Sequence, residues 1–106
     1  MTPKQANGEP FQVTATHATA ASASKAAVSW KVHYITDAVA SSDKAGAILL
    51  IKDGITTIWQ VQMPANGNVV LHFVQPLKGT SGVAVSVDVD GTAACKANIA
   101  GFTLKQ

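Results

Sequence analysis

The chain has 106 residues, of which 47% are hydrophobic and only 13% are charged. This length fits one domain, and the small share of charged side chains excludes a disordered chain, which needs charge to stay solvated. The net charge is +2, but the eight basic residues are all lysines and form no run. Because arginine is the usual residue for phosphate and base-edge contacts, we expect no nucleic-acid partner.

Cysteine usage and hydropathy bear on the cellular compartment. The single cysteine, Cys95, excludes an intrachain disulfide. The first thirteen residues lack the apolar segment of a signal peptide, and the longest apolar run, 47–51, is far shorter than a membrane-spanning helix. We therefore expect synthesis in the cytoplasm and no membrane partner, with export inside a particle released by lysis left open.

The N-terminal part of the chain changes character near Phe11. Residues 1–10 contain two prolines and a glycine and are predicted to form an extended arm, followed by one folded domain over 11–106. The Ala/Ser/Thr-rich stretch 16–27 is interpreted as a weak strand that runs into a loop, with a short helix as the alternative. The alternation that follows, over 28–34, predicts a half-buried strand.

The middle of the chain contains the clearest hairpin. The continuous apolar run 47–51 predicts a strand buried on both faces, and Asp53-Gly54 supplies a tight turn. A second arm follows over 55–63, with Trp59, Val61 and Met63 along one face.

Three further elements complete the chain. We predict a strand over 69–74, a loop over 76–82, and a strand over 83–89 whose valines face inward while Asp88 faces outward. A last strand pair is expected over 93–105, with Gly101 as a bulge.

Seven or eight short strands without an amphipathic helix predict an all-β fold. Two antiparallel sheets packed face to face, as a single β-sandwich or jelly-roll-like domain, bury such strands best. The predicted core consists of Val28, Trp30, Val32, Tyr34, Ile48, Leu50, Ile58 or Trp59, Val61, Leu71, Phe73, Val83, Val85, Val87, Ile99 and Phe102.

Few residues are candidates for catalysis or metal binding. His17, His33 and His72 show no ligand spacing, so we expect solvated or interface side chains, and a metal or acid–base site would require their convergence in space or in an oligomer. The run 88–91 lacks the further ligands of a calcium loop, and Cys95 is expected to be a small core residue. We predict no enzymatic activity and no cofactor.

The C-terminal third carries a resemblance to a known family. It reads Pro76-Leu77-Lys78-Gly79 and then Gly82, an alternating strand over 83–87, a Gly91-Thr92 turn, and a closing strand that ends in Gly101-Phe102. This pattern resembles small β-sandwich virion proteins of tailed bacteriophages, namely capsid decoration (cement) proteins and related head or tail fibre components. The resemblance covers about 75–102, and the hairpin at 47–63 fits it more loosely.

The resemblance implies a homotrimer on the outer surface of the capsid, in contact with the major capsid protein or another virion protein, without a cofactor. We expect lattice contacts from the arm, over 1–12, and the 36–46 and 76–82 loops are the next candidates for contacts between subunits or with the capsid. The predicted interface residues are Pro3, Lys4, Gln5, Asn7, Glu9, Pro10, Phe11, Pro76, Leu77 and Lys78.

Two alternative functions remain. A receptor- or carbohydrate-binding β-sandwich would expose Trp30, Trp59 or Tyr34 in a concave patch, whereas the capsid hypothesis expects these side chains to be buried. A tail-tube or baseplate component would form hexameric rings or stacks.

Overall fold

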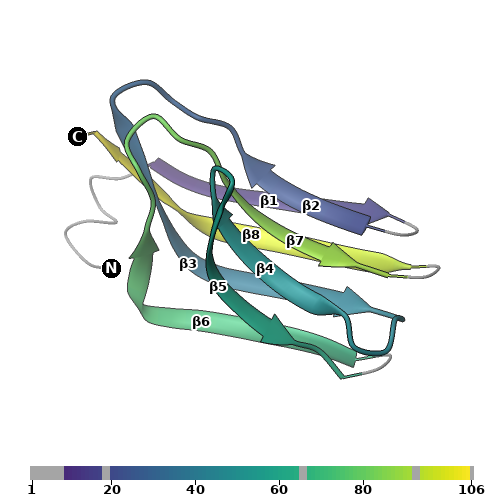
Figure 1. Cartoon of the computed structure of the whole chain (residues 1–106). Coiled ribbons are helices and arrows are strands. Elements are labelled where there is room, and N and C mark those ends of the chain that lie inside the picture. The colour runs from purple at the N-terminus through teal and green to yellow at the C-terminus, as the bar shows by residue number, and fades with distance from the viewer. Residues whose placement is uncertain (1–8, 18–19, 65–66, 92–93, 106) are drawn as a thin grey trace.

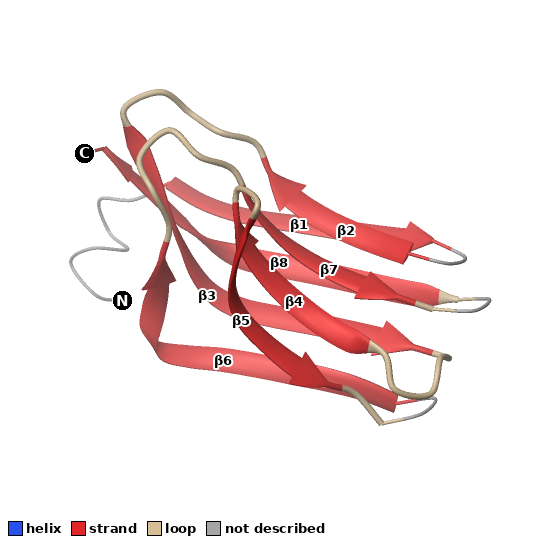
Figure 2. Cartoon of the chain, viewed as in Figure 1, coloured by secondary structure: helices blue, strands red, loops and turns tan. Residues whose placement is uncertain are grey.

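A computed structural model describes residues 9–17, 20–64, 67–91 and 94–105. These residues form strands joined by turns and loops, with no helix among them (Figure 2). No helix of the described residues is therefore long and apolar enough to cross a membrane. The strands are β1 (Glu9–His17), β2 (Ala20–Lys25), β3 (Lys31–Ser42), β4 (Ile48–Asp53), β5 (Thr56–Gln62), β6 (Gly67–Lys78), β7 (Val85–Asp90) and β8 (Cys95–Lys105).

The strands form two four-stranded antiparallel sheets that pack face to face, which confirms the predicted β-sandwich (Figure 1). Sheet A has the order β1-β8-β3-β6, and sheet B has the order β2-β7-β4-β5. At one side of the sandwich β1 and β2 contact each other across the two sheets. At the other side the sheets end in β5 and β6.

The core lies between the sheets and is built largely from small and β-branched residues. On β7 the valines Val85, Val87 and Val89 are buried while Asp88 is not, as the alternation predicts. Cys95 is buried in the same core, again as expected. Each fully buried Val, Leu or Ile side chain contributes about 1.5–3 kcal/mol, so burial of these side chains between the sheets is a main source of stability.

The Asp53-Gly54 hairpin is confirmed. Gly54 has a φ of +63°, and its N–H donates to the carbonyl oxygen of Ala84 at 2.8 Å. The prediction that the preceding run is buried on both faces is wrong, because Leu49 and Ile51 are buried but Ile48 is exposed on the outer side of sheet B. Sheet A covers only one face of sheet B, so the other face meets solvent.

The prediction for 28–34 is also wrong about where the strand begins and about which of its residues face the core. The strand begins at Lys31, and Val28 and Trp30 lie in the preceding loop. His33 and Ile35 face the core, whereas Val32 and Tyr34 lie on the outer side of sheet A. Alternation reveals two faces but does not say which one meets the other sheet, and here Tyr34 and Phe102 lie on the face turned away from sheet B. Val32 and Phe102 are nevertheless buried on that outer side.

The irregularity expected at Gly101 lies on the neighbouring strand. The pairing of β3 with β8 shifts between Ile35 and Asp37, so Thr36 is the extra residue opposite Gly101. A Cβ atom on Gly101 would collide with the carbonyl oxygen of Tyr34. Glycine is therefore required here because the two backbones approach each other too closely for any side chain.

Several predicted boundaries change. The stretch 16–27 does end in a strand, β2, and a loop over 26–30, which confirms that interpretation. The 76–82 loop begins only at residue 79, because β6 continues through Pro76 to Lys78, and most of 36–46 belongs to β3. The last strand pair is a single strand, β8.

The N-terminal boundary also moves. Glu9 and Pro10 pair with β8 and so belong to sheet A rather than to an arm. Residues 1–8, the remainder of the predicted arm, lie outside the described residues.

The predicted core is correct for five residues and misses most of the small ones. Val32, Val85, Val87, Ile99 and Phe102 are buried, whereas Trp30, Ile48, Ile58 and Trp59 are exposed, and the other predicted core residues are only partly buried. The residues that were missed are Ala21, Ala23, Ile35, Ala38, Ala40, Ala47, Leu49, Ile51, Met63, Val89 and Ala97.

Candidate interaction surfaces

The structure separates the three histidines. His33 is buried, with Nε2 2.8 Å from the carbonyl oxygen of Ala26 and Nδ1 2.7 Å from Oγ1 of Thr103. Because a carbonyl oxygen only accepts, Nε2 carries a hydrogen. His72 contacts Asp37 on the outer side of sheet A at 2.7 Å, and His17 lies at the far end of β1. The described residues contain no group of three potential metal ligands.

The remaining candidate chemical groups have structural partners. Asp88 and Asp90 do not converge on a cation site but form ion pairs with Lys52 at 3.1 Å and Lys44 at 2.6 Å. Burial raises the pKa of the Cys95 thiol, and the negative charge of nearby Asp43 and Asp90 raises it further. A protonated, buried thiol is a poor nucleophile, so Cys95 has the character of a core residue.

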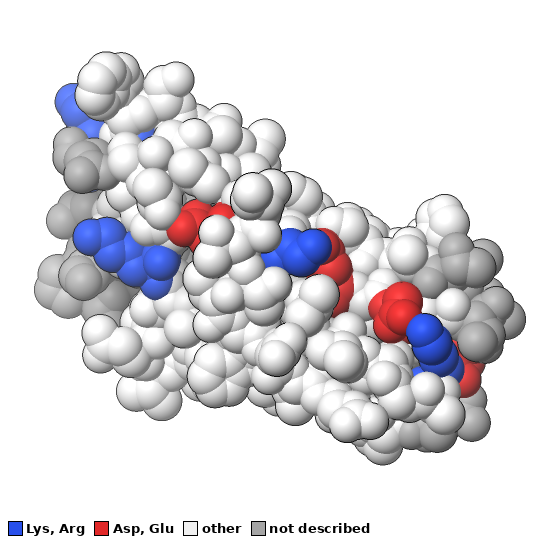
Figure 3. All heavy atoms as spheres, viewed as in Figure 1, with Lys and Arg blue, Asp and Glu red and all other residues white. Residues whose placement is uncertain are grey.

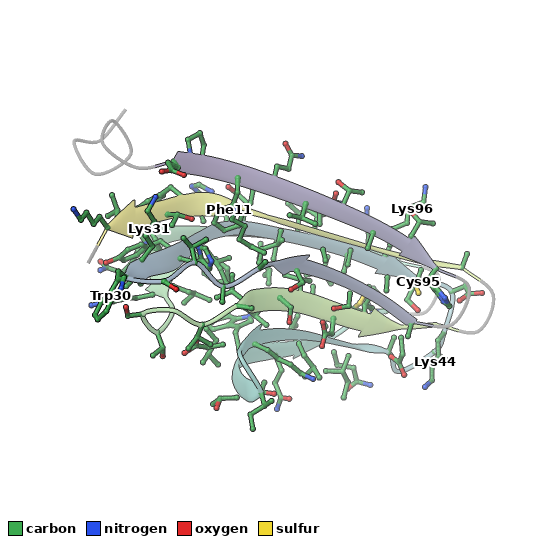
Figure 4. The ribbon with its side chains drawn as sticks, turned by 90° about the horizontal axis from the view of Figure 1, so that it is seen from above. Phe11, Trp30, Lys31, Lys44, Cys95 and Lys96 are labelled. Atoms are coloured by element: carbon green, nitrogen blue, oxygen red, sulfur yellow. The ribbon has the colours of Figure 1, made fainter. Side chains whose placement is uncertain are left out.

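One end of the sandwich presents an exposed tryptophan, and we call it the Trp30 end. Trp30 is 79% exposed and has a φ of +65°, the one positive φ of a residue other than glycine in the described chain. The turn is fixed on both sides, because the Lys31 N–H donates to Val28 O at 3.2 Å and the Gly82 N–H donates to Lys31 O at 2.9 Å. Figure 4 shows Trp30 and Lys31 at one end, opposite Lys44 and Lys96.

Positive charge gathers at the Trp30 end. Lys31 lies opposite Lys105 in the register of β3 and β8. The Lys31 Nζ donates to Glu9 Oε1 at 2.7 Å, and this hydrogen bond, together with the charge of Lys31, lowers the pKa of the Glu9 carboxyl group. Lys25 lies nearby, with its Nζ 5.8 Å from the centre of the Phe11 ring.

The register of sheet A aligns one residue from each of the two groups of predicted interface residues, Pro10 and Lys78, at opposite edges of the sheet. Pro10 pairs with Phe102, Phe102 with Tyr34, and Tyr34 with Lys78, so these residues form one row across the outer face. The rings of Tyr34 and Phe102 stack within this row at 5.0 Å. Because Tyr34 is three residues beyond Lys31, the row lies about 10 Å from the start of β3 and thus borders the Trp30 end.

The other predicted interface residues have different positions. Phe11 and Leu77 pack against the core, and Phe11 also meets the His33 ring edge to face at 5.6 Å. Glu9 binds Lys31, and Pro76 lies within β6. Pro3, Lys4, Gln5 and Asn7 lie outside the described residues.

A second surface follows the strands β5 and β6, and we call it the open edge. Trp59 on β5 is 43% exposed and meets Phe73 of β6 edge to face, with ring centroids 5.4 Å apart. Val61, Val69 and Leu71 are only partly buried behind this contact. Val70 and Val74, on the outer face of β6, are 69% and 92% exposed. The sequence predicted apolar strands here but not that their apolar side chains would remain uncovered.

Each sheet also has a shallow depression on its outer face. The depression on sheet B has a volume of about 700 Å³ and is lined by Ile48, Leu50 and the two Lys–Asp pairs. Acidic and basic groups lie side by side on this face, within a largely uncharged surface (Figure 3). The depression on sheet A measures about 280 Å³ and is lined by Gln12, Asp37, Val39, Asn98 and Ala100. Neither of these two depressions is lined by a tryptophan or tyrosine.

Comparisons with known proteins assign no family. No protein-family model matches the sequence, and no curated protein matches it. Among solved structures, the carbohydrate-binding module TmCBM61 in complex with beta-1,4-galactotriose is 14% identical, with a TM-score of 0.37, over 92% of this chain and 69% of the other. At this TM-score the likeness supports no conclusion about ligands.

Proposed function

We propose that this chain is a structural protein of a tailed-phage virion, a capsid decoration protein that binds the outer capsid surface and stabilises the head by bridging capsomers. The observation that carries the proposal is Trp30, held in a left-handed backbone conformation beside the row that contains Pro10 and Lys78. Its exposure is the opposite of the burial that the capsid hypothesis predicted, so the proposal places the indole in the contact with the capsid rather than in the core.

The local energetics of the Trp30 end favour a contact role. A left-handed conformation costs an ordinary residue about 1–2 kcal/mol, and a large exposed indole gains little from folding in return. Such local costs cluster at functional sites, and tryptophan is the residue type most enriched among interface residues that dominate binding energy.

The composition supports the same proposal. Few charges and a surface rich in Ala, Ser, Thr and Val suit a protein whose surface is largely covered by neighbours. Many weak contacts repeated around a shell stabilise it strongly through multivalency. The mechanism is mechanical, because added buried interface between capsomers resists the outward pressure of packaged DNA. Trp30 and Trp59, which the capsid hypothesis expected to be buried within the fold, are exposed in the single chain. In this proposal they become covered only when the protein assembles.

The exposure of Trp30 also favours a second candidate function, a receptor- or carbohydrate-binding domain of a fibre. An exposed indole is a stacking platform for a sugar ring. This candidate predicts saturable binding of a glycan that the substitution Trp30→Gly abolishes, measured on a glycan array with the purified protein.

The proposal is tested by the composition of purified virions. We expect quantitative mass spectrometry of virions of the phage that encodes the chain to find it at a fixed ratio to the major capsid protein, and on heads separated from tails. Finding it only on tails or fibres, or not in virions, would overturn the proposal.

A further inference from the structure

The open edge consists of two unpaired strand edges that lie at the same side of the sandwich. β6 ends sheet A and β5 ends sheet B. The contact of Trp59 with Phe73 bridges the two sheets there. The backbone N–H and C=O groups along an edge strand that do not point to its neighbour are free to pair with another strand.

Over most of their length these two strands lack the usual protection of an edge. Soluble proteins place charged residues or proline on exposed edge strands to prevent association. Residues 56–62 and 67–75 contain no Lys, Arg, Asp, Glu or Pro. Pro76 and Lys78 protect only the last residues of β6, as Glu9 and Pro10 protect only the start of β1 at the opposite side. An apolar edge without protection is expected where the native assembly covers it.

We infer that the open edge is the docking surface for a second copy of this chain. An edge strand is complementary to itself, because antiparallel pairing across a twofold axis satisfies the free groups of both copies. A twofold axis perpendicular to the planes of the two sheets pairs β6 of one copy with β6 of the second copy. The same axis pairs β5 of one copy with β5 of the second. Because residues 56–62 and 67–75 of the open edge carry no formal charge, two copies meet there without charge repulsion.

The size of the strip agrees with a stable contact. Nine residues, 67–75, extend over about 30 Å at roughly 3.3 Å per residue, and two sheets about 10 Å apart, with their side chains, give a width of about 20 Å. The strip thus offers on the order of 600 Å² per copy, or about 1,200 Å² in total, the lower bound for a specific interface.

The inference deepens the proposed function, because it assigns self-assembly to one surface and leaves the Trp30 end for the capsid. The two surfaces are separable by substitution. Val74 is 92% exposed and Val70 is 69% exposed on the outer face of β6. Lysine at either position therefore costs the isolated fold little, but antiparallel pairing of β6 with β6 of the second copy places these like charges on adjacent strands, where they repel each other. Ser24 on β2 is exposed at the opposite side of the sandwich and provides the matched control, Ser24→Lys.

The experiment is light scattering coupled to size-exclusion chromatography at two protein concentrations, with circular dichroism to verify folding. We expect a wild-type mass of twice the 10.9 kDa chain mass, the same mass for Ser24→Lys, and a folded 10.9 kDa monomer for Val70→Lys/Val74→Lys. A trimeric wild type would contradict the twofold contact. A monomeric wild type, or an oligomer that persists in the folded double variant, would overturn the inference. The variant Trp30→Gly should keep the wild-type mass, so a failure of capsid binding through Trp30 is distinguishable from a failure of self-assembly.

Discussion

The indole ring of Trp59 on β5 meets the phenyl ring of Phe73 on β6 edge to face, with centroids 5.4 Å apart and ring planes inclined by 80°. This contact joins the last strand of one sheet to the last strand of the other. Because Trp59 is also 43% exposed, the same residue stabilises the monomer and belongs to the surface proposed for self-assembly.

We predict that Trp59→Ala lowers the free energy of unfolding by about 2 kcal/mol, less than the 3–5 kcal/mol of a fully buried aromatic residue, because the ring is partly exposed. Urea denaturation of the monomeric Val70→Lys/Val74→Lys background measures this change without a contribution from assembly. The adjacent Ile58→Ala, at an exposed position, is the control and should cost less than about 1 kcal/mol. Equal losses for both variants would show that the ring contact does not hold the sheets together.

The substitution Trp30→Gly is predicted to leave stability within about 1 kcal/mol of the wild type, because relief of the left-handed strain offsets the greater entropy of glycine in the unfolded chain. Chemical denaturation measures the difference. A loss of several kcal/mol would mean that Trp30 has a structural role and that its exposure does not report a contact site.

Glycine is favoured at positions 101 and 82 for two different reasons, a close approach of another strand and a positive φ. In Gly101→Ala the new methyl group collides with the backbone of Tyr34, and we expect a loss of at least about 3 kcal/mol or failure to fold. Gly82 has a φ of +71° and open space around it, so Gly82→Ala should lose only about 1–2 kcal/mol from left-handed strain. Thermal denaturation of both variants tests the ranking, and a milder effect at Gly101 would contradict the assigned close approach of β3 and β8.

Acid is predicted to destabilise the fold through two ion pairs. The hydrogen bonds from Lys31 and Lys44 hold the pKa values of Glu9 and Asp90 below their ordinary values of 4.5 and 3.8. A carboxyl group with a lowered native pKa contributes stability that is present above its unfolded pKa and is lost as the pH falls through the native value.

The measurement is the unfolding free energy between pH 6 and pH 2, a range of about four units that includes the ordinary pKa values of both carboxyl groups. The double variant Glu9→Gln/Asp90→Asn should show a shallower decline below about pH 4.5 than the wild type. Parallel curves would mean that the two pairs, which are largely solvent-exposed, have no net effect on stability.

The sequence was sufficient for features that local chemistry determines. The Asp53-Gly54 turn follows from the conformational freedom of glycine, and the inward valines of β7 follow from their regular alternation with polar residues. The all-β class and the two-sheet packing followed from the number of such strands.

The candidate surfaces depend on tertiary relationships that no local pattern carries. The phase of β3 could not be read from 28–34, because Tyr34 stacks with Phe102 on the outer face while His33 satisfies its ring nitrogens in the core. The exposure of Trp30 depends on a positive φ that sequence patterns assign to glycine or asparagine. The row of Pro10, Phe102, Tyr34 and Lys78 needs the register of four strands.

The measurement that tests the central claim most directly is co-sedimentation of the purified protein with capsids of the encoding phage that lack it. Wild type, Trp30→Gly and the far-end control Lys96→Ala are compared at equal concentration. The account predicts saturable binding for the wild type and Lys96→Ala, and at least about a tenfold loss of affinity for Trp30→Gly, as expected for an interface residue that contributes more than 1.4 kcal/mol. Equal binding by Trp30→Gly, or no binding by the wild type, would contradict it.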